Sequence, residues 1–121
     1  MSRPILDESR IHPAIRDTVA RHQQAIVRQV QEAVDRHPVV VVGMAVNPFP
    51  KKARRALDAA GIAHHDLDFG SYLSLWRERN ALKLWTGWPT FPMVFVKGVL
   101  VGGATDLQRL IDSGELKRLL D

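Results

Sequence analysis

The sequence contains no cysteine among its 121 residues. A chain without thiols forms no disulfide, has no thiolate nucleophile and offers no cysteine ligand to zinc or to an iron–sulfur cluster. Long apolar runs are missing too, because no stretch approaches the roughly 18 residues of a membrane-spanning helix. The first ten residues carry charges of both signs and lack the apolar centre of an export signal. We therefore expect a cytoplasmic protein with no membrane partner and no sulfur chemistry of its own.

Two polar clusters are candidates for metal or nucleic-acid binding, and neither has the appropriate pattern. The five histidines include no metal pair on one helix face, and the adjacent His64 and His65 would point to opposite sides of a strand. The basic run 51–55 has no interleaved aromatic residue, which favours a solvated helix face. The net charge of +4 indicates only a mild preference for anionic partners. We expect no metal and no nucleic-acid partner.

Hydrophobic periodicity predicts an α/β chain of one main domain. A long amphipathic helix is expected over 11–36, ended by His37-Pro38 and followed by a β-branched strand over 39–42. The remaining predicted elements are a helix over 51–60, a strand over 62–68, a helix over 71–84, strands over 93–97 and 99–101, and a helical segment from Gly102-Gly103 to Leu120. This order implies a four-stranded mixed sheet with helices on both faces. It divides the chain into an N-terminal extension, 1–37, and a domain, 38–121.

Three motifs occur in this order and give the sequence a family resemblance. They are Trp88-Pro89-Thr90-Phe91-Pro92, Val101-Gly102-Gly103 followed by Thr105-Asp106, and Gly114-Glu115-Leu116. Together they resemble the W-P-T-x-P, V-G-G and closing motifs of the glutaredoxins, most closely the monothiol branch with the active site C-G-F-S. The resemblance covers about 39–120 and implies a thioredoxin-like fold that carries an extra long N-terminal helix.

The resemblance also implies a glutathione site. In the family, a cis proline presents the preceding backbone to glutathione, which assigns this role to Phe91 and Pro92. Gly103, Thr105 and Asp106 would hold the γ-glutamyl end of the ligand. Each assignment has a structural alternative: Pro92 only sets the entry to an edge strand, and Thr105-Asp106 only caps a helix.

Two basic residues on the predicted helix over 71–84 complete this implied site. Arg79 falls where the family keeps an arginine for the glycine carboxylate of glutathione, and Lys83 lies one turn later on the same face. A solvated helix face explains both residues equally well. The family's lysine after the first strand corresponds to Met44, so one charged contact to glutathione is missing. Trp88 is expected in the core or at the wall of the groove.

The active-site turn of the family corresponds to Asn47, Pro48, Phe49 and Pro50, which leaves no catalytic residue. Asn47 stands in place of the nucleophilic cysteine, and Pro50 lacks an N–H that would help to lower a thiol pKa. Asparagine followed by proline is also a favourable helix start, so a purely structural role is the simpler interpretation. An iron–sulfur cluster, which in the family needs the same cysteine, is not expected.

These observations favour a redox-inactive glutaredoxin-like protein that binds glutathione or a partner protein through the inherited groove. The N-terminal helix could serve as a homodimer or partner surface, or could simply cover the sheet. The alternative is an enzyme that transfers groups to the sulfur of glutathione itself. The single tyrosine, Tyr72, and the absence of serine from the turn make that alternative the weaker one.

Overall fold

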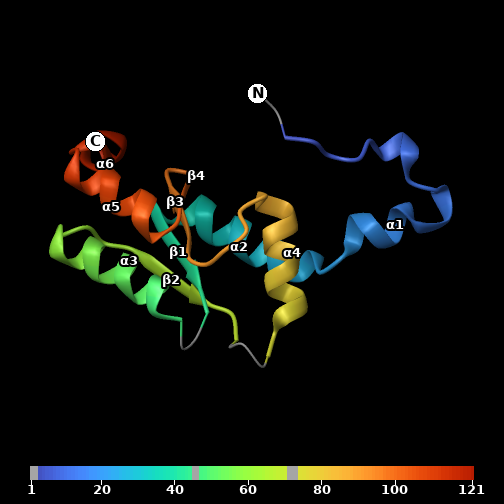
Figure 1. The fold of residues 1–121 in the computed structure, drawn as a ribbon, viewed down its shortest axis with the longest axis horizontal. Coiled ribbons are helices and arrows are strands. Elements are labelled where there is room, and N and C mark those ends of the chain that lie inside the picture. The colour runs from blue at the N-terminus through green and yellow to red at the C-terminus, as the bar shows by residue number, and fades with distance from the viewer. Residues whose placement is uncertain (1–2, 45–46, 71–73) are drawn as a thin grey trace.

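The computed structural model describes residues 3–44, 47–70 and 74–121. The elements in these ranges alternate between helices and strands, with the extension at the N-terminus being wholly helical or irregular (Figure 1). They are η1 (Glu8–Arg10), α1 (Pro13–Arg21), α2 (Gln24–Arg36), β1 (Val39–Gly43), α3 (Pro48–Ala59), β2 (His65–Asp68), α4 (Trp76–Thr86), β3 (Met93–Val96), β4 (Val99–Gly102), α5 (Ala104–Asp112) and α6 (Glu115–Leu120).

The four strands form one mixed sheet in the order β2-β1-β3-β4. β1 and β2 are parallel, which requires the crossover through α3, whereas β3 is antiparallel to both β1 and β4. The turn between β3 and β4 is the tight one predicted at Lys97 and Gly98, and both residues have positive φ, 51° and 82°. The predicted four-stranded mixed sheet with helices on both faces is therefore confirmed.

Each face of the sheet packs against its own helices because β1 is buried on both sides. Val40 and Val42 belong to the core formed with α2 and α4, whereas Val39 and Val41 belong to the core formed with α3, α5 and α6. Alternate residues of a strand point to opposite faces, so the run of four valines supplies both cores. In Figure 1, α3, α5 and α6 lie on one side of the strands, and α2 and α4 lie on the other.

The predicted single helix over 11–36 is wrong, because the structure divides it into α1 and α2. The interruption lies at Gln23, whose φ of 49° and ψ of 38° are left-handed. The apolar stripe explains the position: Ile26 and Val30 are buried against the sheet, but the two turns between Val19 and Ile26 carry no apolar residue on that stripe. The N-terminal extension therefore contains one helix packed on the domain and one that is not.

Smaller differences concern element ends. β2 begins at His65 instead of residue 62, and the C-terminal helical segment is divided at Gly114, whose φ is 78°. Ser71, where a helix is predicted to begin, and Tyr72 lie outside the described residues. None of the helices in the described ranges is long and apolar enough to cross a membrane.

Candidate functional site

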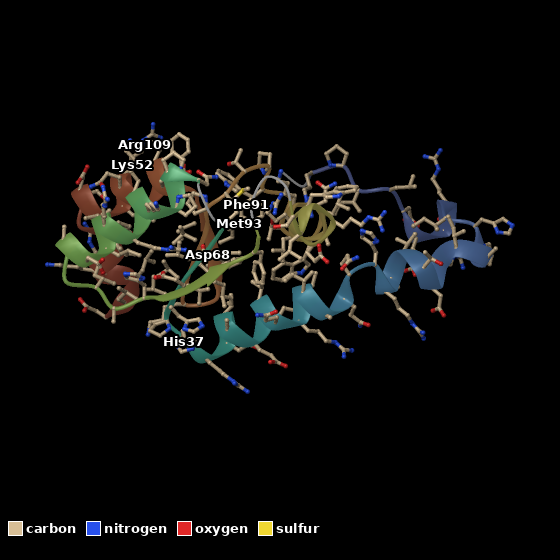
Figure 2. The ribbon with its side chains drawn as sticks, turned by 90° about the horizontal axis from the view of Figure 1, so that it is seen from below. His37, Lys52, Asp68, Phe91, Met93 and Arg109 are labelled. Atoms are coloured by element: carbon tan, nitrogen blue, oxygen red, sulfur yellow. The ribbon has the colours of Figure 1, made fainter. Side chains whose placement is uncertain are left out.

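The sheet register brings the sequence motifs to one end of the sheet. Met93, directly after Pro92, pairs with Val42 near the end of β1. Val94 pairs with Gly102 at the end of β4, so α5 starts beside β3. Figure 2 shows Phe91 and Met93 close together, between the helices of the two faces. The segments before β3, after β1 and after β4 therefore surround one site.

The residues at the start of α3 leave few backbone N–H donors for a ligand. Asn47 is buried, and its side-chain Oδ1 accepts a hydrogen bond from the backbone N–H of Phe49 at 3.0 Å. Pro48 and Pro50 occupy the first and third helical positions and have no N–H to donate. A helix normally begins with several unpaired N–H groups, which can stabilise an anion. The first three residues of this helix offer none, because two are prolines and the N–H of Phe49 is already bonded to Asn47.

Pro50 also fixes the turn against the sheet. A Cβ added to Gly43 at the end of β1 would lie 2.7 Å from the Cβ of Pro50, so the absence of a side chain at Gly43 lets the helix start approach the strand this closely. Phe49 points outward with about half of its surface exposed, and the Nζ of Lys52 lies 6.0 Å from its ring centre. The turn thus presents an aromatic ring and a cation to solvent.

The segment before β3 supplies the wall of the site. The Phe91–Pro92 peptide bond is cis, as the resemblance predicts. The Phe91 side chain is buried, and the Nζ of Lys83 on α4 lies 5.8 Å from its ring centre. The indole of Trp88 approaches Gly103: a Cβ there would lie 3.7 Å from its Nε1. Lys83, Phe91 and Trp88 are therefore brought together around the cis proline.

The start of α5 differs from the start of α3. Asp106 accepts a hydrogen bond from the N–H of Gly103 through Oδ2 at 3.0 Å, so the capping contact that was one of the two interpretations of Thr105-Asp106 is present. Gly102 has a φ of 116°, and its missing side chain makes room for that carboxylate. The N–H groups of Ala104, Thr105 and Asp106 lie in the first turn, where a helix provides no acceptor for them. This end of the site therefore keeps donors for an anionic ligand.

Arg79 occupies a position that the sequence did not predict. It is buried on α4, and its Nη1 donates hydrogen bonds to the carbonyl oxygens of Phe69, at 3.1 Å, and Ser74. A buried guanidinium requires acceptors, and these backbone carbonyls supply them. Arg79 thus braces the chain between β2 and α4, while its role in binding a ligand carboxylate stays a prediction. Met44 is buried in the core on the α2 and α4 face, where an apolar side chain suits the surroundings.

One polar cluster was missed as an interacting unit. His64 lies between two carboxylates, with its Nε2 2.8 Å from Asp58 and its Nδ1 2.6 Å from Asp66. Arg54 pairs with Asp66 and Asp68 in the same cluster. The alternation of His64 and Asp66 next to a strand was the available signal, because such residues share a face. No three such side chains among the described residues are arranged so that they could hold a metal ion.

The strand order, the cis proline before β3 and the helix that starts beside it define a thioredoxin-like protein. The glutaredoxin family model matches residues 39–101, just over half of the chain. A glutaredoxin-like protein of Dictyostelium discoideum is 37% identical over 102 residues, which cover 84% of this chain and 83% of that protein. The bifunctional monothiol glutaredoxin-S16 of Arabidopsis thaliana is 33% identical over 119 residues, covering 88% of this chain and 39% of that longer protein.

Solved structures agree with the sequence relatives. The oxidized glutaredoxin 2 of Chlamydomonas reinhardtii has a TM-score of 0.69 at 27% identity, covering 81% of this chain and 92% of that one. A buckwheat glutaredoxin–glutathione complex has a TM-score of 0.71 at 21% identity, covering 83% and 91%. The chain belongs to the glutaredoxin family, and it is a member without cysteine.

Proposed function

We propose that this protein binds glutathione at the site beside the cis proline and carries out no thiol–disulfide exchange. The contrast between two helix starts supports the proposal most strongly. At α3 a thiol is absent and the first three helical residues have no free N–H, whereas α5 keeps first-turn donors and an acidic residue. This contrast supports ligand binding without electron exchange.

Each end of glutathione has a matching group on this chain. The backbone of Phe91, which precedes the cis proline, would pair with the backbone of the ligand's cysteine residue. The first-turn amides of α5 would hold the γ-glutamyl carboxylate, and Asp106 would pair with the adjacent ammonium group. Lys83, already next to Phe91, would attract the glycine carboxylate. The glutathione complex of the buckwheat relative supports this choice of ligand.

The alternative, an enzyme that activates the thiol of glutathione, receives less support from the same site. Activation requires donors or cations that stabilise a thiolate. Asn47 faces the helix start with its acceptor oxygen, and that oxygen is already bonded to Phe49. A ligand sulfur beside this turn would meet no unpaired backbone donor from the first three positions of α3.

Titration calorimetry with reduced glutathione tests the proposal. The wild-type protein should release or absorb heat at millimolar ligand, and Asp106→Asn should weaken binding about tenfold, because it removes one charged contact but keeps the capping oxygen. Asp112→Asn is the matched control on the same helix, since Asp112 pairs with Gln108 at the other end of α5. The absence of any binding by the wild-type protein would contradict the proposal and leave a partner protein as the ligand of the site.

A second measurement addresses the missing redox step. In a coupled assay of disulfide reduction by glutathione, the protein should not raise the rate above the uncatalysed background. Turnover that scales with protein concentration would contradict the proposed inactivity and favour the alternative enzyme.

A further inference from the structure

Helix α3 carries more positive charge than its own chain neutralises. Its twelve residues include four basic side chains and one acidic side chain. Arg54 pairs with two carboxylates of β2, and Asp58 faces His64. The remaining three basic residues are exposed and pair with no carboxylate in the described ranges: Lys51, Lys52 and Arg55. The outer side of α3 therefore keeps three positive charges that nothing on this chain balances.

Two of these charges are unfavourable for the helix itself. Lys51 is the fourth residue of α3 and lies near the positive end of the helix dipole, where no acidic residue offsets it. Lys51 and Arg55 are also four residues apart, a spacing at which like charges repel. The core does not require either residue, because the buried residues of α3 are Pro50, Ala53 and Leu57. Lys51 and Arg55 therefore lower local stability without a compensating contact inside the chain.

An exposed aromatic ring lies next to these cations. Phe49 is 52% exposed, and the Nζ of Lys52 lies 6.0 Å from its ring centre. Phe49 is the only aromatic residue of α3, and α5 has none. An apolar ring bordered by cations thus faces the solvent, and we call the residues that form it the basic surface: Phe49, Lys51, Lys52 and Arg55.

The neighbouring helix α5 does not cancel this charge. Asp106 caps its own helix, and Asp112 accepts a hydrogen bond from a glutamine one turn earlier, so both carboxylates of α5 are already engaged. α5 packs beside α3, and Figure 2 shows its exposed Arg109 on the same side of the two helices as Lys52. The positive charge of the basic surface therefore continues onto α5.

We propose that the basic surface is the docking site for an acidic segment of a partner protein, with an apolar side chain of that segment packed on the ring of Phe49. Complementary charges speed the encounter and fix the orientation of the two proteins. Contact with the ring adds the buried apolar area that the strongest residues of an interface share. A nucleic acid fits less well, because its bases stack on successive rings and this surface has one. The proposal does not depend on glutathione binding.

Selection of peptides on the full chain tests the proposal. A phage-displayed library of random short peptides is selected on the wild-type protein in the absence of glutathione. The enriched peptides should be rich in aspartate and glutamate, should contain an aromatic or large aliphatic residue, and should bind more weakly as salt is added. Enriched peptides without an excess of acidic residues, or no enrichment at all, overturn the proposal. Because glutathione is omitted, this result is independent of the proposed function.

Two variants with the same change in charge locate the binding site of a selected peptide. Lys52→Glu/Arg55→Glu should raise the dissociation constant at least about tenfold, because it replaces attraction with repulsion. Arg28→Glu/Arg36→Glu is the matched control, since both residues are exposed on α2, which packs on the opposite face of the sheet. The control should change the dissociation constant by less than about twofold. Equal losses in the two variants would show a general effect of net charge and overturn the proposal.

Phe49→Ala separates docking from simple charge attraction. The dissociation constant of the selected peptide should rise about fivefold or more, while its dependence on salt stays the same, because the ring carries no charge. Leu84→Ala is the matched control, since Leu84 is 70% exposed but lies on α4. Unchanged peptide binding in Phe49→Ala overturns the proposal, and so does a single-stranded oligonucleotide that binds the wild-type protein more tightly than the selected peptides.

Discussion

The Oδ1 atom of Asn47 lies 3.0 Å from the backbone nitrogen of Phe49 and accepts its hydrogen bond. This contact stabilises the start of α3, as asparagine caps do. It also occupies the only N–H among the first three residues of the helix, because the other two are prolines. The hydrogen bond between Asn47 and Phe49 therefore both stabilises the helix and removes a donor that could bind an anion.

The first prediction concerns a thiol introduced at this position. Asn47→Cys adds a sulfur atom at a helix start with a single backbone donor, so its pKa should stay near the ordinary value of a cysteine. Asn47→Cys/Pro50→Ser restores a second N–H and should lower the thiol pKa relative to the single variant. The pH dependence of thiolate absorbance in the ultraviolet measures both values.

Thermal unfolding of the two cysteine variants is the control, because Pro50 packs on Gly43 and its replacement must not disorder the turn. If the single variant already has a strongly lowered thiol pKa, donors other than the helix amides stabilise anions here, and the interpretation of α3 is wrong.

The second prediction concerns Gly102. A Cβ at this residue would lie 2.6 Å from the Oδ2 of Asp106 and would require a φ of 116°, so Gly102→Ala should displace the capping carboxylate. We expect a loss of about 1–3 kcal/mol in the free energy of unfolding and weaker glutathione binding. Gly98→Ala is the matched control: its φ is also positive, at 82°, but nothing lies within 4 Å of the added atom. Equal effects on glutathione binding would show that the position of Asp106 is unimportant.

Much of the fold could be predicted because local and long-range signals agree. A run of β-branched residues at 39–42 has few alternatives to a buried strand, and the Lys97-Gly98 turn fixes the following hairpin. The N-terminal helix was predicted too long, because the polar gap between Val19 and Ile26 is short enough to be tolerated by a helix. Whether the helix continues through this gap depends on whether the gap residues contact the core, and that depends on where the sheet ends.

The site could be predicted only where a motif fixes the backbone. The family resemblance of the motif around Pro92 implied the cis bond, and a helix cap was one of the two interpretations of Thr105-Asp106. Arg79 could not be placed, because a long side chain on a helix can point to solvent or to the interior. Its acceptors, the carbonyls of Phe69 and Ser74, come from the path of the chain before α4, which has no signature in the sequence.

The third prediction separates Arg79 from Lys83, its neighbour one turn later. Arg79→Ala removes the hydrogen bonds that the guanidinium donates to the carbonyls of Phe69 and Ser74, and the free energy of unfolding should fall by about 1–3 kcal/mol. Lys83→Ala should change stability by less than about 0.5 kcal/mol and weaken glutathione binding about fivefold, or roughly 1 kcal/mol. Urea unfolding and calorimetry measure the two effects. The reverse pattern, with a stable Arg79→Ala protein that no longer binds, would return Arg79 to the ligand site.

The last prediction concerns the pH dependence of stability. Both ring nitrogens of His64 face carboxylates, Asp58 at 2.8 Å and Asp66 at 2.6 Å, and only the charged ring can donate to both. Burial of the ring opposes its charge, but the hydrogen bonds to Asp58 and Asp66 outweigh burial, so the pKa of His64 is raised above its ordinary value of 6.5. The folded protein therefore holds this proton more tightly than the unfolded chain.

It follows that the stability contributed by His64 is fully present below the unfolded value near 6.5 and is lost as the pH rises through the raised folded value. Urea unfolding over a pH series should show the free energy of unfolding decreasing above that unfolded value. In His64→Asn this decrease should be smaller, while His22→Gln, at an exposed site outside the cluster, should keep it. Nuclear magnetic resonance titration of the His64 ring gives the folded pKa directly. An unchanged pH dependence in His64→Asn would mean that the two carboxylates do not hold the charged ring in solution.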